Sequence, residues 1–183
     1  YDMISAVSDV TVLAKYLDPS FPIDIKEKTP PLIYPFGLNQ SQKKAVENAF
    51  SSQISIIQGP PGTGKTQTIL NIIANAVRNG KTVAVVSNNN SATQNVAEKL
   101  EKYGVSFLTA FLGSLANKEQ FLQAQTGTYP DMRSWTMGKD AHDTLNAEVQ
   151  KLSDELTAML ESRNRIARIE QELLALKPEQ FYF

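Results

Sequence analysis

Eight consecutive residues, 59–66, have the types and spacing needed to bind phosphate groups. They read Gly-Pro-Pro-Gly-Thr-Gly-Lys-Thr and fit the pattern G-x-x-x-x-G-K-[ST]. Glycines let the backbone turn so that the N–H groups of residues 62–66 point into one concavity. Lys65 would reach the β- and γ-phosphate oxygens, and the Thr66 hydroxyl would bind Mg²⁺. The predicted nucleotide-binding residues are Gly59, Pro60, Pro61, Gly62, Thr63, Gly64, Lys65, Thr66 and Gln67, with Lys65 and Thr66 also catalytic.

The residues around this loop support the same interpretation. A short β-branched run, residues 54–57, precedes it, and apolar residues at helical spacing follow it up to residue 77. A chance match to the four constrained positions arises at about a few in 10⁵ per start site. The alternative is a glycine-rich turn that caps a core helix, but three glycines and a lysine are a poor choice for stability alone.

Further elements are expected around the loop. Residues 82–86 form a second apolar run, residues 92–103 a helical pattern closed by Gly104, and residues 105–111 a third apolar run. This alternation of strands and helices predicts an α/β fold with a parallel sheet and flanking helices. Five of the nine prolines lie between Pro19 and Pro35. We therefore expect an N-terminal segment and linker over residues 1–36 and an ATP-binding domain over residues 37–138.

A complete hydrolysis site also needs a carboxylate, usually at the end of an apolar strand. The run 83–86 ends in Ser87, and the run 105–111 is followed by Leu112 and Gly113, so neither supplies one. The chain also begins with Tyr1 and ends in Phe-Tyr-Phe. We expect it to be a piece of a longer protein that holds the carboxylate elsewhere, so that this piece binds nucleotide without hydrolysing it.

The pattern changes after Gly138. Leu145, Val149, Leu152, Leu156 and Met159 are spaced by four and three residues alternately, as in a heptad repeat. Residues 140–176 therefore predict a long helix of about 54 Å at 1.5 Å per residue, either continuous or interrupted near residues 163–165. This helix belongs to a predicted helical stalk over residues 139–183. We expect an apolar stripe of this length to pack against another protein surface. Pairing with a second copy of the chain is one way to provide it.

Composition excludes several classes of protein. The 183 residues contain no cysteine and one histidine, which removes disulfide scaffolds, thiol catalysis and cysteine zinc sites. No uncharged apolar stretch reaches about 18 residues, and the N-terminus lacks a secretory signal pattern. We expect a cytoplasmic protein without a membrane span.

Three motifs together resemble superfamily 1 helicases. Residues 38–42, Leu-Asn-Gln-Ser-Gln, resemble the element that opens this family, and Gln42 lies 17 residues before Gly59. Residues 59–66 resemble the family's motif I. Residues 87–92, Ser-Asn-Asn-Asn-Ser-Ala, resemble motif Ia, with Asn88 where the family usually has proline. The similarity is greatest to the branch that contains the nonsense-mediated-decay helicase and related bacterial DNA helicases. That branch carries a helical stalk inserted in its first motor domain.

The resemblance implies the first RecA-like motor domain of an ATP-dependent translocase on DNA or RNA. It implies that Gln42 reads adenine, which fits an amide that can donate to N7 and accept from the N6 amino group. Alternatively, Asn39 caps a helix and Gln42 closes a capping box. The resemblance also implies that a single nucleic-acid strand contacts Ser87, Asn88, Asn89 and Asn90. Alternatively, this stretch is a loop and helix cap.

Two other functions remain open at this point. The same loop occurs in AAA+ ring ATPases, which would require an oligomer and an acidic strand end downstream. The chain could also act mainly as a coiled-coil interaction module through residues 140–176.

Overall fold

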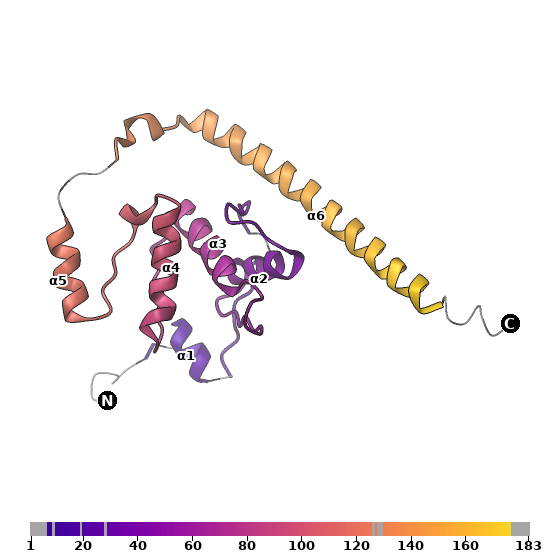
Figure 1. The fold of residues 1–183 in the computed structure, drawn as a ribbon, viewed down its shortest axis with the longest axis horizontal. Helices are drawn as coiled ribbons and strands as arrows, with labels where there is room; N and C mark the ends of the chain where they lie inside the picture. The colour runs from indigo at the N-terminus through magenta and orange to yellow at the C-terminus, as the bar shows by residue number, and fades with distance from the viewer. Residues whose placement is uncertain are drawn as a thin grey trace. The chain divides into compact units, whose positions relative to one another are not determined.

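The computed structural model describes residues 7–8, 10–18, 20–27, 29–125, 127 and 130–176. The predicted start of the N-terminal segment and end of the stalk lie outside these residues. The helices are α1 Val12–Leu17, α2 Gln40–Ser51, α3 Lys65–Arg78, α4 Asn90–Lys102, α5 Leu115–Ala124 and α6 Lys139–Leu176, with 3₁₀ turns η1 Ser106–Leu108 and η2 Met132–Trp135 (Figure 1). None of the described helices is both long and apolar enough to cross a membrane.

The predicted parallel sheet is wrong. Within the described residues the structure has no strand, and its β-pairing is a single antiparallel bridge between Ile25 and Ser52. Residues 55–60 and 81–87 have no regular structure, and residues 106–108 form a 3₁₀ turn. Ile56 and Val86 are 79% and 88% exposed. A β-branched run favours a strand only where neighbouring strands pair with its backbone and a packed face covers its side chains. The described residues offer these runs no partner strand, and most of the side chains in the runs are exposed.

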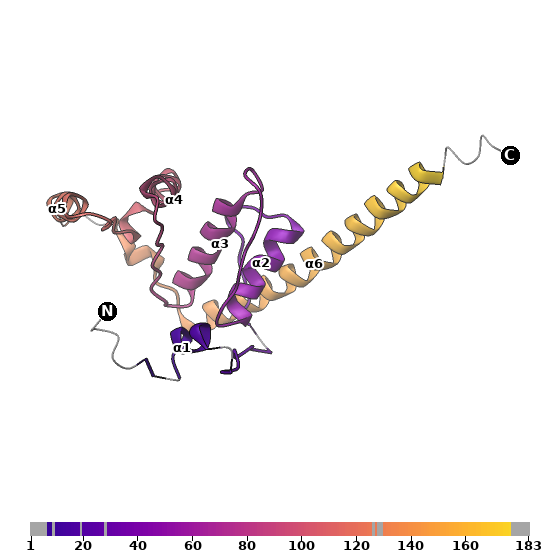
Figure 2. The same ribbon diagram turned by 90° about the horizontal axis from the view of Figure 1, so that it is seen from below.

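The described residues divide into two compact units, residues 7–29 with 34–136 and residues 30–33 with 137–176. In the first unit, α3 packs between α2 and α4 (Figure 2). Leu70 of α3 and Val96 and Leu100 of α4 are buried together, and the partly buried side chains of Phe36, Ile69, Ile73 and Val105 pack against them. This cluster holds in place the helix that follows the glycine-rich loop.

We predict that Leu70→Ala destabilises this unit strongly. Leu70 is 2% exposed in the centre of the cluster, so truncation loses transfer free energy and leaves a cavity, at a cost of about 2–5 kcal/mol. Urea unfolding followed by circular dichroism measures the change. Leu115→Ala on α5, where the side chain is 73% exposed, is the matched control and should change stability little. Equal midpoints for the two variants would contradict this core.

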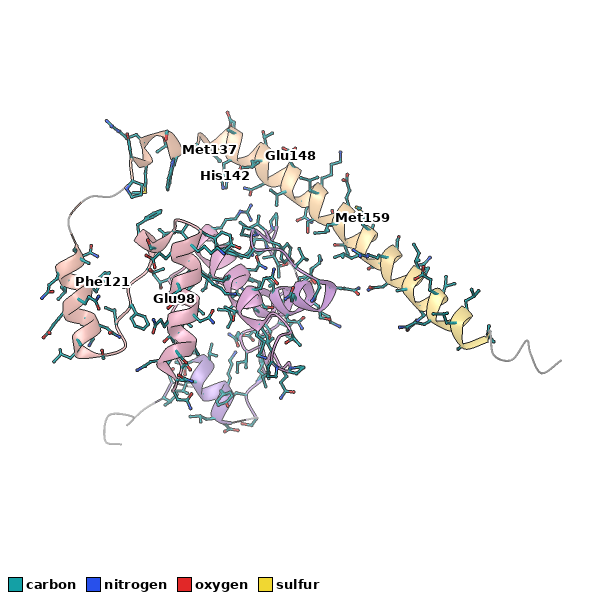
Figure 3. The ribbon with its side chains drawn as sticks, in the orientation of Figure 1. Glu98, Phe121, Met137, His142, Glu148 and Met159 are labelled. Carbon is teal, nitrogen blue, oxygen red and sulfur yellow. The ribbon has the colours of Figure 1, made fainter. Side chains whose placement is uncertain are left out.

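The second unit contains α6, a continuous 38-residue helix. The helix predicted over residues 140–176 is therefore confirmed. No residue of α6 is buried, and the heptad positions Leu145, Leu152 and Met159 are 46%, 55% and 70% exposed. Figure 3 shows side chains along this helix, with His142, Glu148 and Met159 labelled. The predicted apolar stripe is thus present and largely uncovered.

Candidate nucleotide-binding site

The glycine-rich loop leads directly into α3. Gly62 and Gly64 have φ angles of 84° and 80°, a region that side chains other than glycine rarely adopt. Gly64 is the N-cap of α3 and provides no side-chain cap, and the N–H of Thr68 is the first to bond back, to the Gly64 carbonyl at 3.1 Å. The N–H groups of the first turn therefore remain available. Together with the positive end of the helix dipole they can bind an anion.

Lys65 lies over its own loop. Its Nζ donates to the carbonyl oxygens of Gly59 and of Pro60, the latter at 2.8 Å, and the residue is exposed. The Thr63 hydroxyl donates to the same Pro60 oxygen at 2.8 Å. The ammonium group thus has only neutral carbonyl partners among these contacts. Phosphate oxygens, which carry full charge, would be stronger acceptors in their place.

Gln42 connects α2 to the loop. Its Oε1 accepts from the Asn39 N–H at 2.8 Å and its own N–H donates to Asn39 Oδ1 at 2.9 Å, so the capping box is present. Its Nε2 lies 3.3 Å from the Thr63 carbonyl oxygen and 3.2 Å from that of Gly64. The side chain is buried, and it touches the loop predicted to bind phosphate. The capping-box alternative is correct, and reading of adenine stays a prediction.

A cleft of about 480 Å³ lies beside these residues. Both Gln42 and Lys65 line it, together with Gly59, Pro60, Thr63 and residues from the exposed side of α2 such as Lys44. The structure therefore brings part of the predicted site to one cavity. Pro61, Gly62, Gly64, Thr66 and Gln67 do not line the cleft.

Two side chains of α3 hold the start of α2 against this helix: Gln67, which the sequence predicted to bind nucleotide, and Asn71, which it did not single out. The Asn71 amide accepts from the Phe36 N–H at 3.3 Å and donates to the Gly37 carbonyl at 2.8 Å, and Gln67 Nε2 donates to the Phe36 carbonyl. Gly37 has a φ of 76°, and a Cβ there would lie 3.0 Å from Gln67 Nε2. The available signal was an amide at every fourth position, residues 67, 71, 75 and 79, around a segment that is mostly apolar over residues 69–77.

The residues predicted to contact nucleic acid start α4. Ser87, Asn88, Asn89 and Asn90 are all exposed. Asn89 is the N-cap of α4, where its Oδ1 accepts from the Ser91 N–H at 3.0 Å, and its own N–H donates to Ser87 Oγ at 3.1 Å. The helix cap that was the alternative interpretation is therefore observed, and contact with a nucleic-acid strand stays a prediction.

Thr66 is the residue that the sequence predicts to bind Mg²⁺. Thr66 offers one half-buried hydroxyl, and the described residues contain no group of three His, Asp or Glu side chains placed to hold a metal ion. This fits Mg²⁺, which is usually held by one or two protein groups together with phosphate oxygens and water.

A buried hydroxyl precedes the turn at Phe36. Tyr34 Oη is buried and has no hydrogen-bond partner among the described residues. Burial, and then the negative charge of Glu47, raise the pKa of the Tyr34 hydroxyl. Because the pKa of the Tyr34 hydroxyl is higher in the folded state than in the unfolded state, its titration leaves the free energy of unfolding unchanged below the unfolded pKa of about 10. As pH rises above that value, the free energy of unfolding falls.

We predict that Tyr34→Phe stabilises the protein. The change removes an unpaired buried hydroxyl and keeps the ring, for a gain of about 1 kcal/mol. Above about pH 10 the wild type should lose stability and the variant should lose less. Thermal melts between pH 7 and pH 11 measure both effects. Tyr16→Phe, at a side chain 68% exposed, is the control. A destabilised Tyr34→Phe would show that the hydroxyl has a partner.

A glycine-rich loop that turns into a helix N-terminus, with lysine and threonine at its first two positions, defines the class of P-loop nucleotide-binding proteins. The family model described as AAA domain matches residues 37–180. The chain therefore belongs to this family, AAA_11. The predicted resemblance to superfamily 1 helicases is confirmed.

Curated relatives agree with this family. The chain is 42% identical over 69 residues to the DNA polymerase alpha-associated DNA helicase A of Schizosaccharomyces pombe, covering 37% of this chain and 10% of the relative. It is 42% identical over 82 residues to DNA-binding protein SMUBP-2 of Rattus norvegicus (44% and 8%). It is 44% identical over 66 residues to the Drosophila melanogaster homolog of regulator of nonsense transcripts 1 (36% and 6%). The chain thus spans a tenth or less of these relatives. No solved structure matches it.

Proposed function

We propose that this chain is the ATP-binding part of an ATP-dependent helicase that moves along DNA or RNA. The observation that carries the proposal is the loop at residues 59–66, which opens α3 with Lys65 beside a cleft that Gln42 also lines. The helicase relatives support the activity of the whole protein. In this layout residues 1–36 are an N-terminal segment and linker, residues 37–138 bind ATP, and residues 139–183 are the first arm of a stalk. We place the whole protein in the cytoplasm.

The residues divide the binding task between them. Loop and helix N–H groups bind the phosphates, Lys65 neutralises the β- and γ-phosphate oxygens, and Thr66 holds Mg²⁺ bound to them. Magnesium would supply charge neutralisation and polarise the phosphoryl oxygens. The carboxylate that orients the attacking water is proposed to lie in a part of the protein outside these 183 residues.

A nucleotide titration tests the proposal. We expect fluorescently labelled ATP with Mg²⁺ to bind the 183-residue chain saturably, with weak affinity, and we expect phosphate release near the uncatalysed rate. No saturable binding would overturn the nucleotide site. Fast hydrolysis that disappears in Lys65→Ala would instead overturn the statement that the chain is incomplete for catalysis.

Contact of a single nucleic-acid strand with residues 87–90 is the second part of the proposal. Exposed amides and hydroxyls at a helix N-terminus suit phosphate and sugar contacts. We expect Asn90→Ala to weaken binding of labelled single-stranded oligonucleotides in an anisotropy titration. Gln120→Ala, at an exposed amide on α5, is the control. If the two variants bind the oligonucleotide with equal affinity, the proposed contact of this stretch with the nucleic-acid strand is wrong.

The uncovered stripe of α6 favours a second candidate, self-association over residues 140–176. Light scattering across a range of concentrations tests it, because a dimer that forms through the stripe should dissociate in Leu152→Glu. A mass that stays monomeric at all concentrations would reject it. A hexamer that forms only with nucleotide would instead favour a ring ATPase.

A further inference from the structure

The face of α3 that carries amides is unusual for a buried helix. Asn71 and Asn75 are both 0% exposed, in a position where an apolar side chain would normally pack. Buried polar groups of this kind are costly unless they are bonded. Asn75 and Asn79 each donate to the helix carbonyl one turn earlier, at 2.8 and 2.7 Å. Gln67 and Asn71 bond to a different segment of the chain.

That segment is the turn at Phe36 and Gly37. The N–H and carbonyl of Phe36 and the carbonyl of Gly37 are all bonded to the side-chain amides of Gln67 and Asn71. The turn itself is closed by the Gly37 N–H, which donates to the Tyr34 carbonyl at 3.1 Å. Two residues later the chain reaches Asn39, the cap that binds Gln42. The helix that begins at the phosphate loop therefore sets where α2 begins.

Chemistry determines how the amides point. The Phe36 carbonyl can only accept, so Gln67 must present Nε2 to it, and its Oε1 then faces Gln42 Nε2 at 3.1 Å. The Asn39 N–H can only donate, so Gln42 Oε1 must face it. The orientation of Gln42 thus follows from two backbone groups and from Gln67.

Gln42 Nε2 has more acceptors than protons. Its two protons face Gln67 Oε1 at 3.1 Å and the loop carbonyls of Thr63 and Gly64 at 3.3 and 3.2 Å. If Gln67 holds one proton, the two loop carbonyls share the other. Bonds this long are weaker than those near 2.9 Å. The shared proton is the one that a better acceptor can take.

We infer that Gln67 and Asn71 are positioning residues that set the Gln42 amide for the choice of adenine over guanine. This inference rests on the proposed function. Adenine offers an acceptor at N7 and a donor at N6, so an amide can pair with both. The shared Nε2 proton of Gln42 would go to N7, and the second lone pair of Oε1 would accept from N6. Guanine has only acceptors at N7 and O6, which the same amide cannot both satisfy.

The test compares ATP with GTP on the full 183-residue chain. Each nucleotide is titrated with Mg²⁺ against wild type, Gln67→Met, Asn71→Leu and the control Asn75→Leu, which changes an equally buried amide of the same helix. We expect both test variants to lose about tenfold of the ATP-over-GTP affinity ratio, mainly through weaker ATP binding. Asn75→Leu should lower the melting temperature and keep the wild-type ratio.

The ratio separates positioning from a structural role. If Gln67→Met and Asn71→Leu melt earlier but keep the wild-type ratio, the two residues are only structural and the inference is overturned. Should Asn71→Leu fail to fold, Gln67→Met decides, because its side chain is only half-buried. Equal binding of ATP and GTP by wild type would overturn the inference and leave the phosphate site intact. A wild type that binds neither nucleotide would overturn both.

Discussion

Lys65→Ala is expected to abolish measurable nucleotide binding and to leave the fold intact. The change removes charge-assisted hydrogen bonds to phosphate, worth about 1.5–3 kcal/mol each, so the dissociation constant should rise at least about tenfold for each bond lost. The fold should survive because the side chain is exposed and its contacts are with carbonyls of its own loop. Titration with fluorescent ATP measures the loss, and circular dichroism measures the fold.

Lys81→Ala is the matched control for this prediction. Lys81 is an exposed lysine just after α3, outside the cleft-lining residues, so its loss changes net charge equally without touching the loop. Wild-type affinity in Lys65→Ala would show that the ammonium does not face the phosphates. A similar loss in both variants would show a general charge effect.

Gly64→Ala is expected to damage the site even more, because it acts on both the loop and Gln42. A Cβ at position 64 would lie 2.1 Å from Gln42 Nε2, too close for any real contact, and the φ of 80° adds about 1–2 kcal/mol of strain. Gln42 would have to move away from the loop. We expect loss of ATP binding together with a lower melting temperature.

Gly80→Ala separates strain from the clash. Gly80 also has a positive φ, 66°, but a Cβ there meets nothing within 4 Å. It should cost stability through strain alone and should leave ATP affinity near the wild-type value. If Gly64→Ala and Gly80→Ala have the same ATP affinity, the close approach of Gln42 to the loop does not contribute to ATP binding.

The helices and the loop could be read from short stretches of sequence. The amphipathic pattern predicts α3 and α4, and the heptad pattern predicts α6, which the structure shows as one continuous helix. The loop at residues 59–66 could be found because its glycines, Lys65 and Thr66 lie within eight consecutive residues. Each of these features depends on neighbours within a few positions, and local rules of this kind are visible in sequence.

The sheet could not be judged in this way. Residues 54–57 and 82–86 have strand-like composition, but pairing depends on partner strands that the described residues do not provide. Such a run has a tendency to form a strand and needs a neighbour to do so. Predicting the sheet from the runs alone assumed those neighbours.

By itself, the sequence determined the chemistry that this chain carries: a phosphate-binding loop, a helix that follows it, an amide upstream and a long apolar stripe. Only the tertiary structure decided which of these groups meet. Gln42 touches Gly64 across 22 residues of chain, and Asn71 bonds Gly37 across 34. Such contacts follow from how α2 packs on α3, because hydrogen bonds between distant residues form only after packing has brought their backbones together.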